Sequence, residues 1–226
     1  MRGRQHGNRL ARLKTAILIS GRGSNMRALI ESCRPPAAPA EIVLVLSNNP
    51  DAGGLAYAAK AGIPAAVVDH RAYRERTAFD AELDRRLRAA DVGFVCLAGF
   101  MRLLTPAFVE RWRDRMINVH PSLLPAFPGL ETHARALAAG VRFHGCTVHF
   151  VRFETDTGPI IVQAAVPVQA DDTPDSLAAR VLAQEHRIYP QALAWVAEGR
   201  VRIEGDRTVV TGAAVPPAAL VSPTPA

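Results

Sequence analysis

The stretch AILISGRGSNMRALIESC, residues 16–33, places three local patterns in direct succession. It begins with four apolar residues, passes through a turn that contains Gly21 and Gly23, and continues into a segment of helical character. Continuous apolar strands that alternate with helices are typical of sheets covered on both faces. The stretch therefore predicts a buried strand at 16–19 and a helix at 24–33, the first unit of an α/β fold.

The same alternation continues along residues 15–200. Further strands are predicted at 42–46, up to 67–68, and at 92–97, 116–119, 147–151 and 160–168. Further helices are predicted at 53–61, 72–90, 105–113, 132–139 and 174–198, the last of them interrupted by Pro190. We expect one α/β domain over residues 15–210, with about seven strands in a mostly parallel, twisted sheet and helices on both faces.

The two ends of the chain differ in composition from this domain. Residues 1–14 contain four Arg, one Lys and no acid, and so hold five of the six excess positive charges. Basicity confined to one end predicts a disordered tail rather than a nucleic-acid surface. The tail also lacks the serines typical of an organelle transit peptide. The Ala/Pro-rich segment 211–226 predicts a second disordered tail.

Apolar run lengths and cysteine number also predict the cellular compartment of the protein. The longest apolar run, residues 92–101, is shorter than the ~18 residues that a membrane span requires. No apolar segment of the signal-peptide kind follows the basic N-terminus. The three cysteines lie far apart, and an odd number suits a reducing compartment. We expect a cytoplasmic protein that binds neither membrane nor nucleic acid.

The turn at residues 20–25 is a candidate anion site. Small residues let backbone N–H groups approach a ligand, and a helix start favours negative charge, so a phosphate suits it. A dinucleotide fits less well, because Met26 stands where the G-x-G-x-x-G fingerprint has its third glycine. No Lys follows the glycines as it does in a P-loop. A plain strand-to-helix turn with Ser24 as N-cap explains the same residues.

The stretch INVHPSLLPAFPG, residues 117–129, places an amide and an imidazole on one strand face. Asn118 and His120 are two residues apart, so their side chains point the same way. They lie at the carboxyl end of a predicted strand, where ligands bind in sheets of this kind. Taken alone, His120 is equally consistent with a hydrogen-bonded structural histidine.

An aspartate and a pair of histidines later in the chain are further candidates for a functional site. Asp156 lies in a loop before a Gly-Pro pair, where a turn-forming Asp is the ordinary interpretation. His144 and His149 are a weaker metal-binding alternative, because His149 lies in an apolar strand and no third ligand is near in the sequence.

Five motifs together resemble a known family. They are ISGRGSN at 19–25, LAGFMRLL at 97–104, INVHPSLLPAFPG at 117–129, HGCTVHFV at 144–151 with D-x-G-P at 156–159, and QEHRIYP at 184–190. In this order and spacing they resemble the glycinamide ribonucleotide formyltransferases, folate-dependent enzymes of purine synthesis, over roughly residues 15–205. The resemblance implies a Rossmann-like formyltransferase fold, 10-formyltetrahydrofolate as co-substrate, no metal, small-molecule substrates, and a monomer or homodimer.

The resemblance also implies residue roles. The catalytic trio would be Asn118, His120 and Asp156. The residues that contact the ribonucleotide would be Gly23, Ser24, Asn25, Leu182, Ala183, Gln184 and Glu185. Those that contact the folate would be Asn118 and Asp156 together with Arg76, Met101, Arg102, Leu103, Leu104, Arg152, Phe153, Glu154 and Thr155. Phe153 stands where relatives commonly place an acid, and Thr157 replaces a frequent glycine or alanine. A cis Leu124–Pro125 bond is also expected.

In such an enzyme, the amine of the ribonucleotide attacks the formyl carbon, and negative charge develops on the formyl oxygen. The Asn118 amide and a protonated His120 would donate hydrogen bonds to that oxygen. Asp156 would favour the imidazolium and steer a water that relays a proton from the amine.

Several alternatives share features with this prediction. Formyltetrahydrofolate deformylase also contains HPSLLP, but its similar part comes after an extra N-terminal domain. In this chain the first strand is predicted near residue 15, which leaves no room for such a domain. Methionyl-tRNA formyltransferase adds a C-terminal barrel, where a Pro-rich tail follows here. Another formyl or hydroxymethyl transferase of the same fold is a further alternative. A non-catalytic nucleotide-binding module would bind phosphate without turnover, and leaves the Asn118, His120 and Asp156 set unexplained.

Overall fold

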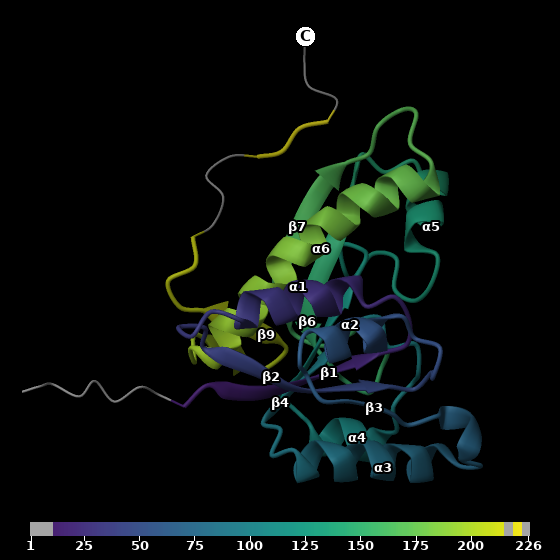
Figure 1. The fold of residues 1–226 in the computed structure, drawn as a ribbon. Helices are drawn as coiled ribbons and strands as arrows, with labels where there is room; N and C mark the ends of the chain where they lie inside the picture. Colours follow the sequence, from purple (N-terminus) through teal and green to yellow (C-terminus); the bar gives the residue numbers. More distant parts are fainter. Residues whose placement is uncertain (1–10, 215–218, 223–226) are drawn as a thin grey trace, which may run out of the picture.

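A computed structural model describes residues 11–214 and 219–222, and its centre is a seven-stranded sheet (Figure 1). The strand order is β3-β2-β1-β4-β5-β6-β7. The bounds are β1 (Leu13–Ile19), β2 (Ala40–Ser47), β3 (Ala65–Val67), β4 (Phe94–Leu97), β5 (Met116–His120), β6 (Phe143–Phe150) and β7 (Ile160–Pro167). Pairing is parallel from β3 to β5 and antiparallel between β5, β6 and β7. The predicted mostly parallel sheet is confirmed.

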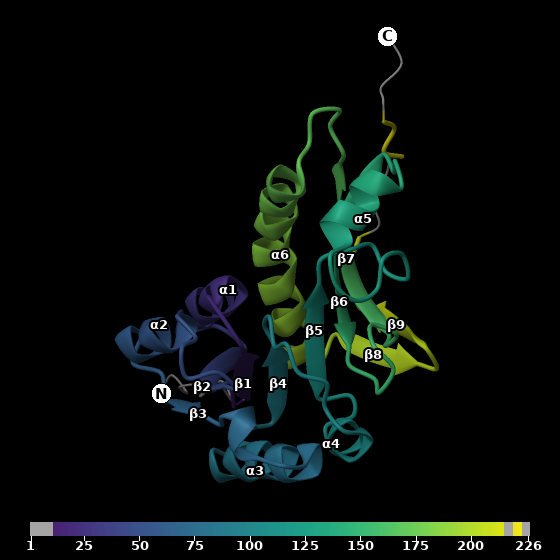
Figure 2. The ribbon, with the colours of Figure 1, turned by 90° about the vertical axis from the view of Figure 1, so that its right-hand side faces the viewer.

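Helices cover both faces of the sheet (Figures 1 and 2). One face carries α1 (Ser24–Cys33), α2 (Gly54–Lys60) and α6 (Pro174–Ala197), and the other carries α3 (Arg76–Ala89) and α4 (Pro106–Arg111). The short α5 (Thr132–Ala138) lies against α6. Alternate residues of β1 serve two cores: Ile17 and Ile19 pack on the α1 and α6 side, Ala16 and Leu18 on the α3 and α4 side. This alternation explains why β1 is apolar without interruption.

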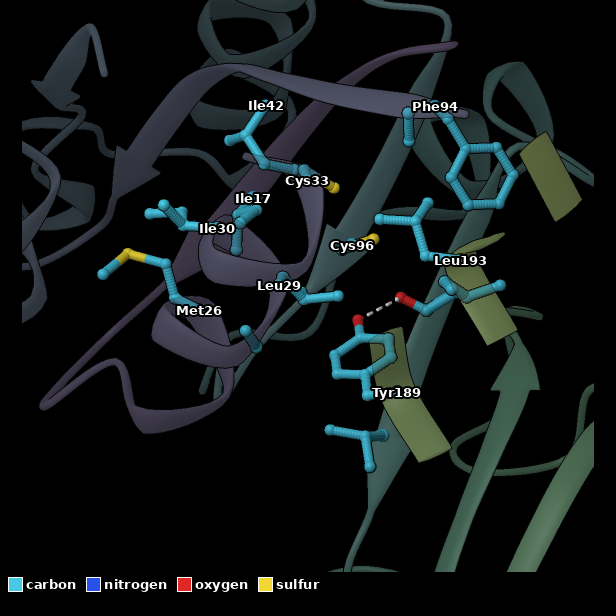
Figure 3. Close-up of a cluster of buried hydrophobic side chains, with 14 of the residues drawn as sticks. Ile17, Met26, Leu29, Ile30, Cys33, Ile42, Phe94, Cys96, Tyr189 and Leu193 are labelled. Atoms are coloured by element: carbon cyan, nitrogen blue, oxygen red, sulfur yellow. Dashed lines mark hydrogen bonds between the residues drawn. The ribbon is translucent and has the colours of Figure 1, made fainter. Parts of the chain in front are cut away.

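The core beneath α1 and α6 also anchors the carboxyl ends of two strands. The fully buried Tyr189 of α6 places its hydroxyl 2.9 Å from the Leu97 carbonyl oxygen and 3.2 Å from that of Ile117. Figure 3 shows this hydroxyl among the side chains of Leu29, Cys96 and Leu193. Because Leu97 ends β4 and Ile117 precedes Asn118, the contact fixes the base of the loops that follow.

Some element bounds differ from the prediction. The helix predicted at 72–90 begins at Arg76, because Asp69 caps a separate short 3-10 helix, η1 (His70–Ala72). β6 begins at Phe143, four residues before the predicted start. The expected interruption at Pro190 is wrong: α6 is continuous, with Tyr189 and Leu193 buried on its inner face. Their packing holds the helix, although Pro190 lacks the N–H that the ladder would use.

The end of the described domain contains a hairpin that was not predicted. Strands β8 (Val201–Glu204) and β9 (Arg207–Val210) pair antiparallel, and β9 lies against β7. Both strands alternate exposed and half-buried residues, and Gly205 makes the turn between them with φ 61°.

In the structure the tail boundaries lie closer to the two ends of the chain than predicted. Leu13 and Lys14, which the composition assigned to the basic tail, begin β1, and the Thr211 N–H donates to the Arg200 carbonyl. Residues 1–10, 215–218 and 223–226 of the predicted tails lie outside the described residues. Within the described chain, no helix has both the length and the apolar character to cross a membrane.

The strand order defines where a ligand would enter. The chain moves outward from β1 to β2 and β3, then returns to the other side of β1 as β4, so the order reverses between β1 and β4. Open α/β sheets bind ligands at the carboxyl ends of strands beside such a reversal. The turn at residues 20–25 and the loop at residues 98–104 meet there, joined by a 3.2 Å hydrogen bond from the Ser20 N–H to the Gly99 carbonyl.

Candidate active site

Asn118 and His120 occupy the carboxyl half of β5 and, two residues apart, share one face of the sheet. His120 is only 6% exposed, and Asn118 is half-buried. The antiparallel pairing with β6 sets His149 opposite Asn118 and Thr147 opposite His120. The register of this one strand pair therefore assembles four polar side chains at the end of β5.

His149 fixes the orientation of the Asn118 amide. Its Nδ1 lies 2.9 Å from the Phe150 carbonyl oxygen, and its Nε2 lies 3.3 Å from Asn118 Nδ2. Burial lowers the pKa of His149, so the ring is neutral at neutral pH. A neutral ring that donates from Nδ1 must accept at Nε2, and Asn118 Nδ2 is the donor. One Asn118 N–H is thereby used, and the second is left for a ligand.

Asp156 lies in the loop between β6 and β7 and reaches back to His120. Its Oδ2 is 3.4 Å from His120 Nδ1 and accepts a 2.8 Å hydrogen bond from the Gly129 N–H. The two side chains are 7% and 9% exposed, so the pair is shielded from water. The other ring nitrogen, His120 Nε2, lies 3.0 Å from the Phe127 carbonyl oxygen. Both neighbours are acceptors, and only an imidazolium can donate to both.

The proline-rich loop is held in place by two side chains of β6 and β7. The Leu124 N–H donates to Thr147 Oγ1, and Gln163 Nε2 donates to the Leu124 carbonyl at 2.9 Å. The Thr147 hydroxyl in turn donates to the Ser122 carbonyl at 2.7 Å. The expected cis Leu124–Pro125 bond is confirmed. These contacts fix Gly129 and Phe127, which touch Asp156 and His120 respectively.

A cavity opens beside this cluster, and we name it the β5-side cavity. It is lined by Leu97, Phe100, Arg102, Leu103, Leu104, Val109, Asn118, His149, Val151, Arg152, Phe153, Thr155 and Asp156. Eight of the predicted folate residues line it: Arg102, Leu103, Leu104, Asn118, Arg152, Phe153, Thr155 and Asp156. Its lining combines apolar with polar residues, as sites for small molecules do.

A second hollow, the β1-side cavity, lies at the start of α1. It is lined by Ser20, Gly21, Arg22, Gly23, Ser24, Asn25, Ala98, Gly99 and Met101. Gly23 has φ 73°, and a Cβ there would come within 3.0 Å of the Gly54 Cα, so the turn requires glycine. The N–H groups of the first turn of a helix have no partner within the helix, so the predicted anion would find donors here.

One predicted ribonucleotide residue of α6 is linked to this turn. The buried Glu185 accepts a 2.6 Å hydrogen bond from Asn25 Nδ2. Burial raises the pKa of Glu185, and the hydrogen bond from Asn25 opposes that rise. Within the described residues, Asn25 Oδ1 is buried without a hydrogen-bond partner. The pair thus extends the polar wall of the β1-side cavity towards α6.

Other predicted residues lie away from the two cavities as defined. Arg76 is the exposed first residue of α3, and Glu154 is exposed in the loop before Asp156. Met101, expected near the folate, lines the β1-side cavity instead, and its N–H donates to Ser20 Oγ at 2.7 Å. Three predicted ribonucleotide residues of α6 also line neither cavity: Leu182, Ala183 and Gln184.

Sequence reasoning missed the supporting roles of His149, Thr147, Gln163 and Ser20. The signal for the first two was present, since polar residues at alternate positions 147 and 149 interrupt an otherwise apolar strand. His149 does not pair with His144, which packs its ring against those of His133 and Phe127. Among the described residues, no group of three His, Cys, Asp or Glu is placed to hold a metal ion.

Comparison with known proteins gives this arrangement a family. The model of the formyl transferase family matches residues 13–193. A phosphoribosylglycinamide formyltransferase of Escherichia coli is 44% identical over 91% of this chain and 97% of its own length. The chain belongs to the formyl transferase family, among the phosphoribosylglycinamide formyltransferases.

The solved structures agree with the sequence relatives of this formyl transferase. The glycinamide ribonucleotide transformylase 1 of Symbiobacterium toebii superposes with a TM-score of 0.86 at 50% identity, covering 88% of this chain and 94% of that one. A trifunctional purine biosynthetic protein of Gallus gallus is 51% identical over 85% of this chain. This chain spans only 19% of that longer relative, about a fifth of its length.

Proposed function

We propose that this formyl transferase moves the formyl group of 10-formyltetrahydrofolate onto the amine of glycinamide ribonucleotide, a step of de novo purine biosynthesis. The observation that carries the proposal is the cluster of Asn118, His120 and Asp156, of which Asn118 and Asp156 line the β5-side cavity and His120 lies buried behind them. The bacterial relative and the solved structure compared above are transferases by name, which favours transfer over hydrolysis.

The two cavities suit the two substrates. We assign the ribonucleotide phosphate to the start of α1, at Gly23, Ser24 and Asn25, with Glu185 of α6 near the sugar. We assign the folate to the β5-side cavity, where it supplies an activated formyl group. The cavities meet at the loop after β4, so an amine from one and a carbonyl carbon from the other can approach each other.

The residues at the end of β5 suit the developing charge. The free Asn118 N–H is a donor held in place by His149, so it needs no rearrangement when charge grows on the formyl oxygen. The two N–H groups of a His120 imidazolium face Asp156 and the Phe127 carbonyl, so one of them must leave its acceptor to reach that oxygen. Removal of one preorganised donor of this kind costs ~2.7–4 kcal/mol in other enzymes. The Asp156 carboxylate stabilises the imidazolium, and it can also hold a water that carries a proton away from the attacking amine.

The proposal is tested by an assay with purified protein, glycinamide ribonucleotide and 10-formyltetrahydrofolate. We expect formyl transfer that requires both substrates and that His120→Ala reduces by at least two orders of magnitude. Release of formate without ribonucleotide would instead identify a deformylase. Binding of the ribonucleotide without any turnover would identify a nucleotide-binding module, and either outcome would overturn the proposal.

We further propose that the protein works in the cytoplasm as a monomer or homodimer on these small molecules. The three cysteines, all buried and unpaired, suit a reducing compartment. Analytical ultracentrifugation of the purified chain distinguishes the two states, and a tetramer would contradict the proposal.

A further inference from the structure

The loop after β4 forms a wall that the two cavities share. Residues Leu97, Phe100 and Arg102 line the β5-side cavity, whereas residues 98, 99 and 101 between them line the β1-side cavity. Met101 is 68% exposed and has no packed environment of its own to hold it. A shift of this loop would therefore change both cavities at once.

The Ser20 hydroxyl holds this loop in place. It accepts a 2.7 Å hydrogen bond from the Met101 N–H and donates a 2.6 Å hydrogen bond to Asn48 Oδ1. A hydroxyl has one hydrogen to donate and lone pairs to accept, so both contacts form at the same time. The Ser20 backbone adds the bond from its N–H to the Gly99 carbonyl. Ser20 is thus bonded twice to the loop that separates the cavities.

Asn48 gives the Ser20 hydroxyl a fixed direction. It is 4% exposed, directly follows β2, and donates its N–H to the Ile19 carbonyl. Its own carbonyl oxygen lies 2.9 Å from His70 Nδ1 in η1. The side-chain amide of Asn48 has a neighbour on each side: its Nδ2 lies 3.3 Å from His70 Nδ1, and its Oδ1 accepts from Ser20. A continuous polar chain therefore runs from η1 through β2 and the first turn to Met101.

We propose that Ser20 is a positioning residue that couples the binding of the two substrates. The inference rests on the proposed function, which assigns the ribonucleotide phosphate to the β1-side cavity and the folate to the β5-side cavity. A phosphate held by the turn at 20–25 orders Ser20, Ser20 orders Met101, and the ordered loop gives the folate its cavity wall. Ordering the loop once serves both ligands, so each strengthens the binding of the other by the same factor.

The test measures this factor by calorimetry. The folate used is tetrahydrofolate, which has no formyl group to transfer. Its dissociation constant is determined in the presence and absence of saturating glycinamide ribonucleotide, for wild type, Ser20→Ala and Ser20→Thr. Because one hydrogen bond changes an equilibrium by about two- to tenfold, we expect Ser20→Ala to lower the coupling factor by that amount. Ser20→Thr keeps the hydroxyl and should restore it. Ser32→Ala is the matched control and should leave the factor unchanged, because among the described residues the Ser32 hydroxyl bonds only within α1.

A second measurement examines the hydrogen bond between Ser20 and Met101 without either substrate. Hydrogen exchange of the Met101 amide should be faster in Ser20→Ala and in Asn48→Ala than in wild type, because its acceptor is lost or loosened. A coupling factor of one in wild type, an unchanged factor in Ser20→Ala, or unchanged exchange at Met101 would each overturn the inference. If wild type transfers formyl groups while the coupling factor is unaffected by Ser20→Ala, the proposed function stands and only this inference fails. Absence of both transfer and binding would mean that the proposed function itself is wrong.

Discussion

Replacement of Asp156 by Asn tests the centre of the proposed mechanism. Asn has the shape of Asp, and its amide oxygen can still accept the hydrogen bond that the Gly129 N–H now gives to Asp156. The variant removes only the negative charge next to His120, at a site where both side chains are less than a tenth exposed. We therefore expect the fold to persist and the imidazolium to lose its counter-ion.

The size of the effect follows from the geometry. At the 3.4 Å that separates His120 Nδ1 from Asp156 Oδ2, and with an effective dielectric constant of about 20, the attraction between the charges is about 5 kcal/mol. Desolvation of the two groups offsets part of this attraction. A net loss of about 3–4 kcal/mol at the transition state corresponds to a fall in kcat of about two to three orders of magnitude.

Two measurements decide the outcome. Steady-state kinetics should show the loss in kcat with little change in the KM for the ribonucleotide, because its phosphate is assigned to the start of α1. Nitrogen NMR of the His120 ring at neutral pH should show a smaller imidazolium fraction in the variant. Asp206→Asn, an exposed change in the β8–β9 turn, is the control. Turnover within threefold of wild type, or an unaltered His120 ring spectrum, would refute the reasoning and leave Asp156 as a turn residue.

Three further changes probe other parts of the structure. Ser24→Asp should weaken the ribonucleotide at least tenfold more than the folate in separate calorimetric titrations, because it puts a negative charge where the phosphate is assigned; equal losses would contradict the assignment. Gly23→Ala should destabilise the protein by about 1–3 kcal/mol in urea unfolding, because φ is 73° and Gly54 is too close for a Cβ; unchanged stability would show that the turn adapts. Burial lowers the pKa of His144 to about 4, below the 6.5 of an unfolded histidine, so the unfolded chain binds more protons between these values. Stability should therefore fall on acidification from pH 7 towards pH 4, and His144→Gln should reduce the fall by up to about 3 kcal/mol; an identical pH profile in the variant would exclude His144 as a cause.

Local patterns were sufficient for the central strands because β1, β4 and β5 are buried over most of their length on both faces. The apolar run at residues 16–19 contributes to both cores, with Ile17 and Ile19 in one and Ala16 and Leu18 in the other. Only a strand covered on both faces buries such a run completely. The hairpin of β8 and β9 lacked such a signal. Its strands are short and half-exposed, and they form because β7 and each other lie near, which is a tertiary effect.

The sequence predicted neither the continuous helix at Pro190 nor all contacts of the site, and both failures have the same physical origin. A proline usually interrupts a helix, but the buried contacts of Tyr189 and Leu193 outweigh the lost hydrogen bond, and no local sequence rule contains those contacts. Asn118 and His120 could be paired from their spacing on one strand. That His149 faces Asn118 depends on the register between β5 and β6, and that Ser20 bonds to Met101 depends on the neighbouring positions of β1 and β4. The sequence contains both partners of each pair but not their distance.

Two histidines with different hydrogen-bond partners lie beside one carboxylate at the site. His120 and His149 both lie within 4 Å of Asp156, at 3.4 and 3.8 Å. Distance to the carboxylate therefore cannot distinguish them, and the remaining partners must. His120 faces acceptors on both nitrogens, which favours two N–H groups and a positive charge. His149 faces the Phe150 carbonyl on one side and the Asn118 amide N–H on the other, so a neutral ring with a free lone pair completes both bonds. A second charge on His149 would break the bond to Asn118 and repel His120. In the proposed mechanism, the depressed pKa of His149 keeps its ring neutral, so that one Asn118 N–H stays free beside His120.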